Sequence, residues 1–501
     1  MNVLALALLA LQTSFAGDRP TPPEPVPVHD VVAVPAPPPP SLVDELRSFE
    51  SSWVFKKATS GLHVVDLQSG EEVYAVGADA LLVPASTMKV LTASTALHFL
   101  GPSFRFTTDV RKTGKLDAAG TLHGDLYVVG HGDPTFVVEK MWKMIVDLRL
   151  AGITRIEGSV FFDDTYHPDG PVLPGWNKPE DDDRGTPYFS TLSALTLNSN
   201  TTVLVIGPGA EVGSKAVVQL ETPTHGYVEV ESEVSTVSAS GRKDIRVERK
   251  VTPDSTSFEV TGTWPIDETD RMTVRRTVAD PTAHFIAAFR AMAESQGIAV
   301  TGRWERGKAP SSAEEVVSVE SAPLSSVLAD MNKSSLNLFA EQVLRTVGAE
   351  VTGEGSTAGG IEAIHQYLET LGIGPEEATL VNGSGLSREA RVAPSVLTAV
   401  LVDMAKDPKV SPEFQASLAI AGTDGTLWAR LRDQPGRMRG KTGTLDNVIC
   451  LTGYLDADNG RRYAFAWLVN DTGGRQQATR DVHDQFARRV FAIDDGGVVS
   501  P

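Results

Sequence analysis

The segment that decides the fold runs from residue 81 to residue 101 and reads LLVPASTMKVLTASTALHFLG. Apolar residues after Ser86 recur with a helical period until the glycine at 101, so we expect a helix that starts near this serine. Residues three apart share one face of a helix, which would make Ser86 and Lys89 neighbours. The pair fits a nucleophile with its base, and it fits equally a capping hydroxyl followed by a solvated lysine. A second Ser-x-x-Lys at 240–243 shows that this motif alone decides nothing.

Length, charge and cysteine content narrow the classes of protein. At 501 residues the chain is too long for one compact core, which favours two or three domains. The net charge of −19, with no basic block to offset it, argues against a nucleic-acid partner or an anionic membrane surface. Cys450 is the only cysteine, which excludes an internal disulfide and a cysteine-based metal cluster. The ten histidines show no HExxH spacing, and we expect no metal and no other cofactor.

The N-terminal residues indicate export. The run NVLALALLAL is too short to span a bilayer, and Ser14 and Ala16 supply the small residues of a cleavage site, so residues 1–16 are interpreted as a signal peptide. No Lys or Arg precedes the run, and a cytosolic protein with an apolar N-terminal strand is the alternative. Residues 17–42 are rich in proline, which indicates an extended linker. No later segment is apolar enough for stable insertion into a membrane.

Three further regions differ in texture. Residues 43–102 contain a predicted hairpin, GLHVVDLQSGEEVYAVGAD, followed by the Ser86 helix. Residues 103–310 show short strand-like runs separated by Gly, Pro and Asp, which predicts one or two inserted β-rich domains. Residues 311–495 return to helical patterns and end with two strands, GTLDNVICLTGYLDA and RRYAFAWLVND, joined at Asn459-Gly460, and a last helix.

Two downstream motifs, Ser335-Leu336-Asn337 and Lys441-Thr442-Gly443-Thr444, favour a catalytic role for the Ser86 helix. Together with Ser86 and Lys89 they resemble the three active-site motifs of the penicillin-recognising serine acyltransferases, in their usual order. A second Lys-Thr-Gly, at 112–114, falls between the first and second motif and inside the β-rich block, so we interpret it as a surface feature.

The spacing of the motifs indicates one family within this class. Ser86 and Ser335 lie 249 residues apart, and segments such as GDLYVVGHGDPTF and NGSGLSRE share that family's texture. From residue 43 to 492 the chain resembles the class C low-molecular-mass penicillin-binding proteins, the D-alanyl-D-alanine carboxypeptidase/endopeptidase family. Leu336 and Asn382 depart from the family, in which Asp is common at both positions, and this bears on fine specificity.

The resemblance implies both a fold and an activity. The fold is α/β (α+β), a serine β-lactamase/transpeptidase-like core with a large β-rich insertion. The implied protein is a periplasmic serine-type D-Ala-D-Ala carboxypeptidase, and also a D,D-endopeptidase, that cleaves peptidoglycan stem peptides through an acyl-serine intermediate. Its partners would be peptidoglycan peptides and β-lactam antibiotics, the latter as covalent inhibitors.

The chemistry assigns a task to each motif. A serine hydroxyl is a poor nucleophile, and Lys89 can take its proton only when partly neutral, which burial and the nearby charge of Lys441 would favour. Ser335 would then pass a proton toward the leaving amine, and Asn337 would hold Lys89 or the substrate amide.

The third motif is assigned to the substrate. The N–H groups of Ser86 and Thr444 would form the oxyanion hole. Lys441 and the hydroxyls of Thr442 and Thr444 would bind the terminal carboxylate of the substrate, next to Gly443. Asn337 as a surface amide and Lys441 as a solvated charge are the alternatives.

A specificity pocket is the finest prediction. The resemblance places Trp176, Asp183 and Tyr188 against the cleft. Such a pocket, with a carboxylate for an amine and Arg388 for a carboxylate, would suit the amino acid terminus of meso-diaminopimelate. An acidic surface loop and a solvated arginine are the alternative. For the whole protein, a β-lactamase or esterase on the same scaffold and a non-catalytic cell-wall binding module are the competing functions.

Overall fold

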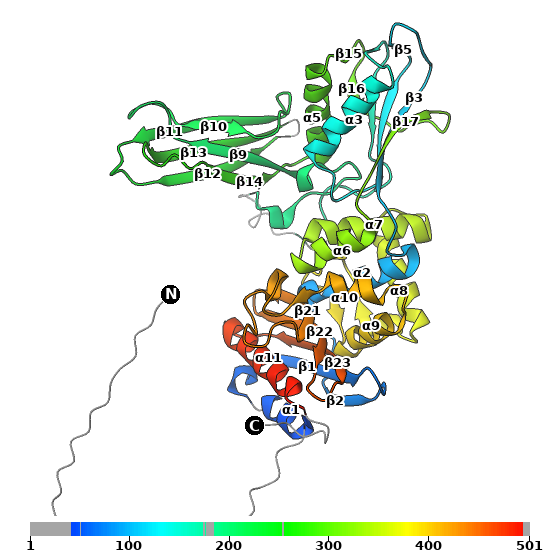
Figure 1. Cartoon of the computed structure of the whole chain (residues 1–501), viewed down its shortest axis with the longest axis vertical. Helices are drawn as coiled ribbons and strands as arrows, with labels where there is room; N and C mark the ends of the chain where they lie inside the picture. Colours follow the sequence, from blue (N-terminus) through cyan, green and yellow to red (C-terminus); the bar gives the residue numbers. More distant parts are fainter. Residues whose placement is uncertain (1–41, 51, 174–175, 177–184, 253–254, 494–501) are drawn as a thin grey trace, which may run out of the picture. The chain divides into compact units, whose positions relative to one another are not determined.

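The structure covers the chain from the first helix onward. The expected signal peptide lies outside the described residues, as do all but the last residue of the expected linker, and Asp183. No helix in the part that is described is long and apolar enough to cross a bilayer. The computed structural model describes residues 42–50, 52–173, 176, 185–252 and 255–493 (Figure 1).

The central sheet joins the two ends of the described chain. Its six antiparallel strands follow the order β2-β1-β23-β22-β21-β20. Both hairpins expected from the sequence are confirmed, because β1 pairs with β2, and β22 pairs with β23 across the Asn459-Gly460 turn. β1 also pairs along its whole length with β23. The bounds are β1 Thr59–Asp66, β2 Glu72–Val76, β20 Ala419–Ile420, β21 Met438–Leu445, β22 Val448–Asp456 and β23 Arg462–Asn470.

One strand differs from the prediction. The sequence predicts a single strand from Gly443 onward, whereas the structure has two, β21 and β22, joined by a turn at Asp446-Asn447. Asn447 has a left-handed backbone (φ 57°), which asparagine tolerates better than most residues. β20 pairs with β21 only at Arg439 and Gly440. Beyond Gly440, the outer side of β21 therefore has no partner strand among the described residues.

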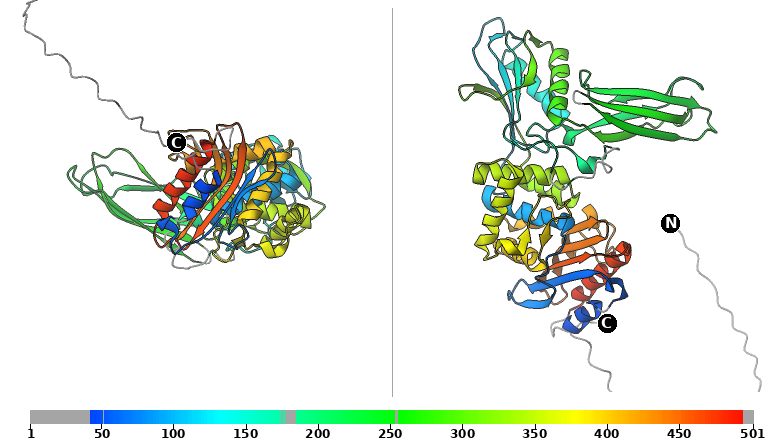
Figure 2. Two further views of the ribbon diagram at one scale, coloured as in Figure 1. Left: turned by 90° about the horizontal axis from the view of Figure 1, so that it is seen from below. Right: turned by 180° about the vertical axis from the view of Figure 1, so that it is seen from behind.

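Helices cover both faces of this sheet (Figure 2). α1 and α11 pack on one face, and α2 and α9 pack on the other, where α6, α7, α8 and α10 complete the core. β23 reads RYAFAWLVN, and its residues 463–469 form the continuous apolar run of a strand buried on both faces. The bounds are α1 Leu42–Glu50, α2 Met88–Leu100, α6 Leu324–Lys333, α7 Asn337–Thr352, α8 Thr357–Thr370, α9 Pro394–Lys406, α10 Ser411–Ser417 and α11 Gln476–Phe491.

The block between α2 and α6 contains two further hydrophobic cores. The first lies between a five-stranded sheet, a four-stranded sheet and the helices α3 (Val138–Leu150) and α5 (Pro281–Ser295). β17 pairs with β3, so the five-stranded sheet reaches Glu320, beyond the boundary expected at residue 310. The strands are β3 Thr107–Lys112, β4 Lys115–Leu116, β5 Thr121–His123, β6 Leu126–Gly130, β7 Arg155–Ile156, β8 Val160–Asp163, β15 Ala299–Val300, β16 Trp304–Arg306 and β17 Glu314–Glu320.

The second core lies between two three-stranded sheets, ordered β10-β9-β14 and β11-β13-β12. Trp264 and Phe258 are fully buried in it. β11 runs parallel to β13, while β12 returns antiparallel to it. The bounds are β9 Thr201–Gly207, β10 Val217–Leu220, β11 Val228–Val237, β12 Asp244–Val251, β13 Thr256–Pro265 and β14 Met272–Thr277.

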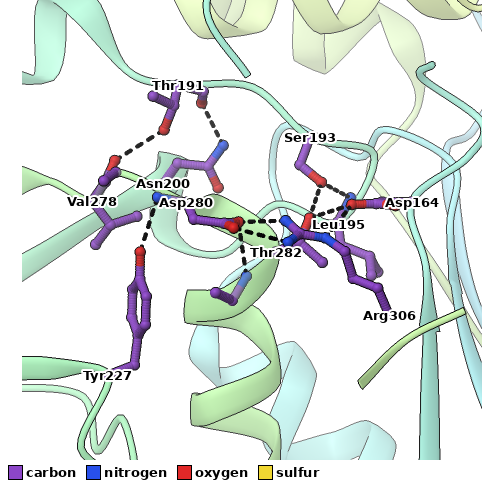
Figure 3. A network of polar contacts seen from close by, with 12 residues as sticks. Asp164, Thr191, Ser193, Leu195, Asn200, Tyr227, Val278, Asp280, Thr282 and Arg306 are labelled. Atoms are coloured by element: carbon purple, nitrogen blue, oxygen red, sulfur yellow. Dashed lines mark hydrogen bonds and ion pairs between the residues drawn. The ribbon is translucent and has the colours of Figure 1, made fainter. Parts of the chain in front are cut away.

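A polar network ties the ends of β8, β16 and α5 together (Figure 3). Arg306 donates to Asp164 and to both carboxylate oxygens of Asp280, and Asp280 also caps the N-terminus of α5 through the Ala283 N–H. The Thr282 hydroxyl donates to Asp164 at 2.7 Å. These groups line a cavity of about 540 Å³. The Thr282 hydroxyl also lies 2.6 Å from that of Ser193, so the network holds the start of α5 against the segment that contains Ser193.

Candidate active site

Ser86 lies in a tight turn rather than at a helix cap. The 3₁₀ turn Ala85–Thr87 precedes α2, and Ala85 is held in a left-handed backbone conformation (φ 46°). Thr87 is the N-cap of α2, and no side chain caps this terminus. The Ser86 hydroxyl lies 3.0 Å from the Lys89 Nζ instead. The structure therefore contradicts the interpretation of Ser86 as a capping hydroxyl.

Lys89 is fully buried beneath Ser86. Its Nζ donates to the Asn337 Oδ1 at 2.7 Å and to the Ser384 carbonyl at 2.9 Å. Burial lowers the pKa of Lys89 to about 7, although the nearby carboxylate of Glu341 acts in the opposite direction. A neutral amine has two N–H groups and one lone pair. With both N–H groups donated to Asn337 and Ser384, the lone pair is left for the proton of Ser86.

Ser335 and Lys441 form a second serine–lysine pair. The Lys441 Nζ donates to the Ser335 hydroxyl at 2.9 Å and to the Thr442 carbonyl at 2.8 Å. Ser335 has a left-handed backbone (φ 56°), an uncommon conformation for this residue that is typical of functional sites. Burial, and then the charge of Lys89, hold the pKa of Lys441 well below its usual value. The sequence predicts the converse effect, of Lys441 on the pKa of Lys89, and that pKa is lowered by burial.

The Lys-Thr-Gly strand packs directly against the Ser86 turn. A Cβ added to Gly443 would lie 2.8 Å from the Pro84 carbonyl oxygen, so only glycine allows this approach. Thr444 is exposed and Thr442 is partly exposed on the open side of β21, whereas Lys441 is fully buried. The Thr442 hydroxyl donates to the Thr426 hydroxyl at 2.8 Å. Two threonines of this strand are thus at least partly accessible next to the Ser86 turn.

Two residues near Lys89 escaped the sequence analysis. Glu341 lies one turn after Asn337 on α7, is fully buried, and accepts the N–H groups of Gly383 and Ser384 at 3.0 and 2.8 Å. The sequence of the segment NGSGLSRE supports the family resemblance but predicts no contact with Lys89. In the structure its Ser384 carbonyl accepts a hydrogen bond from Lys89. A signal was present, since a carboxylate four residues after Asn337 on an apolar helix face must find partners when buried.

The residues of the predicted specificity pocket are only partly accounted for. The Tyr188 carbonyl accepts the Asn337 Nδ2 at 3.1 Å, which places this residue beside the site. Trp176 is buried and packs edge-on against Phe189. Arg388 is exposed and donates to the Asp446 carbonyl at 2.6 Å, at the turn between β21 and β22. Asp183 lies outside the described residues.

The duplicate motifs lie elsewhere. Lys112 ends β3 and pairs with Glu314 at 2.6 Å. Lys243 pairs with Glu268 at 2.7 Å and lies over the ring of Trp264, 3.7 Å from its centre. Both belong to the inserted region.

An antiparallel sheet between helical layers, with a buried Ser-x-x-Lys turn against a Lys-Thr-Gly edge strand, defines the class of penicillin-recognising serine enzymes. Within this class the chain belongs to the D-Ala-D-Ala carboxypeptidase 3 (S13) family, which it matches over residues 51–490. It is therefore a serine-type peptidase, a hydrolase.

Similar proteins cover most of the chain. The D-alanyl-D-alanine carboxypeptidase of Actinomadura sp. (strain R39) is 32% identical over 449 residues, which are 86% of this chain and 81% of that protein. The D-alanyl-D-alanine carboxypeptidase DacB of Haemophilus influenzae is 25% identical, over 82% of this chain and 85% of that protein. The crystal structure of penicillin binding protein 4 (dacB) from H. influenzae superposes with a TM-score of 0.73 at 24% identity, over 87% of this chain and 97% of that one. This last likeness confirms the predicted fold class.

Proposed function

We propose that this carboxypeptidase removes the terminal D-Ala from peptidoglycan stem peptides, and that Ser86 is its nucleophile. The observation that carries the proposal is the distance of 3.0 Å between the Ser86 hydroxyl and the buried Lys89, whose pKa is lowered to about 7. Near neutral pH about half of the Lys89 side chains would be neutral and able to accept the serine proton.

In the acylation step the Ser86 oxygen attacks the carbonyl carbon of the scissile bond while its proton moves to Lys89. The negative charge on the carbonyl oxygen is stabilised by the main-chain N–H groups of Ser86 and Thr444. When the peptide bond breaks, the proton on Lys89 passes through Ser335, which Lys441 holds at 2.9 Å, to the leaving D-Ala amine, and Lys89 is neutral again. Water then hydrolyses the Ser86 ester by the reverse order of proton transfers.

The preference for a C-terminal residue follows from β21. The accessible hydroxyls of Thr442 and Thr444 donate to the free carboxylate of the substrate. Lys441 precedes these threonines on the same strand, and its Nζ is held by the Ser335 hydroxyl and the Thr442 carbonyl. From this position its positive charge would stabilise the substrate carboxylate. An internal peptide has no such carboxylate and would bind more weakly at this edge.

Several finer assignments belong to the same proposal. D,D-endopeptidase activity and acylation by β-lactams are proposed as further reactions of Ser86; the same fold binds a β-lactam in penicillin binding protein 4 of H. influenzae. Residues 1–16 are proposed as a signal peptide for export to the periplasm. Residues 103–310 are proposed as accessory domains within the peptidase core.

The diaminopimelate pocket is proposed from Tyr188, Asp183 and Arg388. Tyr188 lies beside Asn337, and Arg388 lies at the end of the Lys-Thr-Gly strand. The test compares kcat/KM for meso-diaminopimelate and L-lysine peptides in the wild type and in Asp183→Ala. A ratio that the substitution leaves unchanged would remove Asp183 from the pocket.

The main experiment incubates the purified protein with labelled penicillin and, separately, with muropeptides. A stable adduct and release of terminal D-Ala are expected, and both should disappear in Ser86→Ala. Rapid penicillin turnover would indicate a β-lactamase, and the absence of any adduct would indicate a binding module. Release of D-Ala by Ser86→Ala would refute the assignment of the nucleophile.

A further inference from the structure

The buried helix α7 carries a row of polar groups that extends past the three motifs. Asn337, Glu341 and Arg345 follow one another at intervals of one turn, and all three are buried. Asn337 binds Lys89 directly. Glu341 does not, and no step of the reaction described above uses it. A buried carboxylate is costly unless it is paired and hydrogen-bonded, so the partners of Glu341 indicate its role.

The contacts of Glu341 lead to Lys89 through the main chain. Its two carboxylate oxygens accept the N–H groups of Gly383 and Ser384, and the carbonyl of the same Ser384 accepts a hydrogen bond from the Lys89 Nζ. The position of this carbonyl fixes the direction of one N–H group of a neutral Lys89, and Asn337 fixes the other. Together they direct the remaining lone pair at Ser86.

The loop that carries Ser384 has little freedom of its own. The Gly385 N–H donates to the Asn382 Oδ1 at 2.9 Å. Gly385 has a φ of 75°, and a Cβ there would lie 1.8 Å from the carbonyl oxygen of Ala85, the residue before the nucleophile. The loop is therefore clamped between Glu341 on one side and the Ser86 turn on the other.

The charges around Lys89 give Glu341 a second effect. Lys441 on β21 has the same sign of charge as Lys89, and Glu341 on α7 has the opposite sign. One turn after Glu341 lies Arg345. Burial lowers the pKa of Arg345, and the charges of Asp169 and Glu341 act in the opposite direction. Burial raises the pKa of Glu341, while the N–H groups of Gly383 and Ser384 and the charge of Lys89 favour its ionised form.

We propose that Glu341 is a positioning residue of the acylation step: its carboxylate fixes the Ser384 carbonyl against Lys89, and its charge sets how readily Lys89 holds a proton. The inference rests on the proposed role of Lys89 as the base. It concerns a residue outside the three motifs, and it predicts two separable effects, one on the orientation of Lys89 and one on its ionisation.

The test is the pH profile of acylation by a chromogenic β-lactam in wild type, Glu341→Gln and Glu341→Asp. Lys89 works in its neutral form, so the rate rises with pH through its pKa. Glutamine removes the negative charge of Glu341, which lowers the pKa of Lys89. The acid limb of the profile should therefore shift to lower pH by about one unit. The glutamine side chain also places an N–H group where a carboxylate oxygen accepts a main-chain N–H, so the Ser384 carbonyl is held less well. The acylation rate on the high-pH plateau should fall about 10-fold, less than the roughly 10²-fold loss expected when a base is removed altogether.

Aspartate separates the two effects. It keeps the charge but is one methylene shorter, so it should lower the plateau and leave the acid limb in place. The control is Glu350→Gln, which removes a carboxylate from the exposed end of the same helix and should change neither quantity. Circular dichroism and the Tm of each variant establish that it is folded.

The outcomes distinguish this inference from the proposed function. A wild type that no β-lactam acylates would refute the function itself. An acylated wild type with an unmoved acid limb in folded Glu341→Gln would refute the inference, since a merely structural role scales the rate equally at every pH. If Glu341→Gln does not fold, Glu341→Asp takes its place in the test. A pH profile of acylation for Glu341→Asp identical to that of the wild type would then refute the positioning role of Glu341.

Discussion

The rate at which a β-lactam acylates Ser86 should depend steeply on pH. An exposed lysine with a pKa of 10.5 is neutral in only about 1 of 3,000 molecules at pH 7, whereas Lys89, at about 7, is neutral in about half. The shift amounts to about 5 kcal/mol, which the fold supplies by removing Lys89 from water. We expect the rate to rise about 10-fold per pH unit below pH 6 and to level off near pH 8.

The perturbation that isolates Lys89 is Lys89→Arg. Arginine keeps the positive charge and can donate to Asn337 and Ser384, but it stays protonated throughout the accessible pH range. The acylation rate should fall by at least about 10²-fold at every pH, and the pH dependence should disappear. Because Lys441 interacts with Lys89, the wild-type profile belongs to the pair, and the variant shows which part depends on Lys89.

The assay is stopped-flow absorbance with a chromogenic cephalosporin from pH 5 to pH 9, with Ser86→Ala as the blank and the Tm recorded at each pH. A wild-type rate that stays constant over this range would refute the proposed base. So would a Lys89→Arg variant that acylates within a few-fold of the wild type.

Three further predictions test the surroundings of the site. Gly385→Ala should abolish acylation and lower the Tm, since the added Cβ would lie 1.8 Å from the Ala85 oxygen; a soluble variant with normal acylation would contradict the packing. His284 is buried and its pKa is lowered to about 4, so the unfolded state binds more protons below pH 6.5 and stability is lost between pH 6.5 and pH 4. Urea denaturation should show a weaker pH dependence over this window for His284→Leu, by up to about 1 kcal/mol per pH unit, and identical curves would refute this assignment. Arg388→Ala should lower kcat/KM for meso-diaminopimelate peptides more than for L-lysine peptides, by about 10-fold; an unchanged ratio would remove Arg388 from the pocket.

Much of the fold could be predicted from local patterns. The hairpins of β1–β2 and β22–β23 follow from alternating apolar residues about strong turn signals, and α2 follows from its helical period. The turn at Asp446-Asn447 is harder to predict because it has only two residues, neither of them Gly or Pro, between Leu445 and the apolar start of β22. The pairing of β17 with β3 joins segments about 200 residues apart, and no local pattern encodes it.

The sequence by itself predicts most residues of the candidate site, though not Glu341 or Ser384. The three motifs stand in a fixed order, and the interval of three residues between Ser86 and Lys89 brings them to one face of a helix turn. Only the tertiary structure decided what these residues can do. The pKa of Lys89 depends on its burial and on Glu341, and its orientation depends on Asn337 and on the Ser384 carbonyl. Burial and main-chain contacts between distant segments are properties of the packed chain, and no short stretch of sequence contains them.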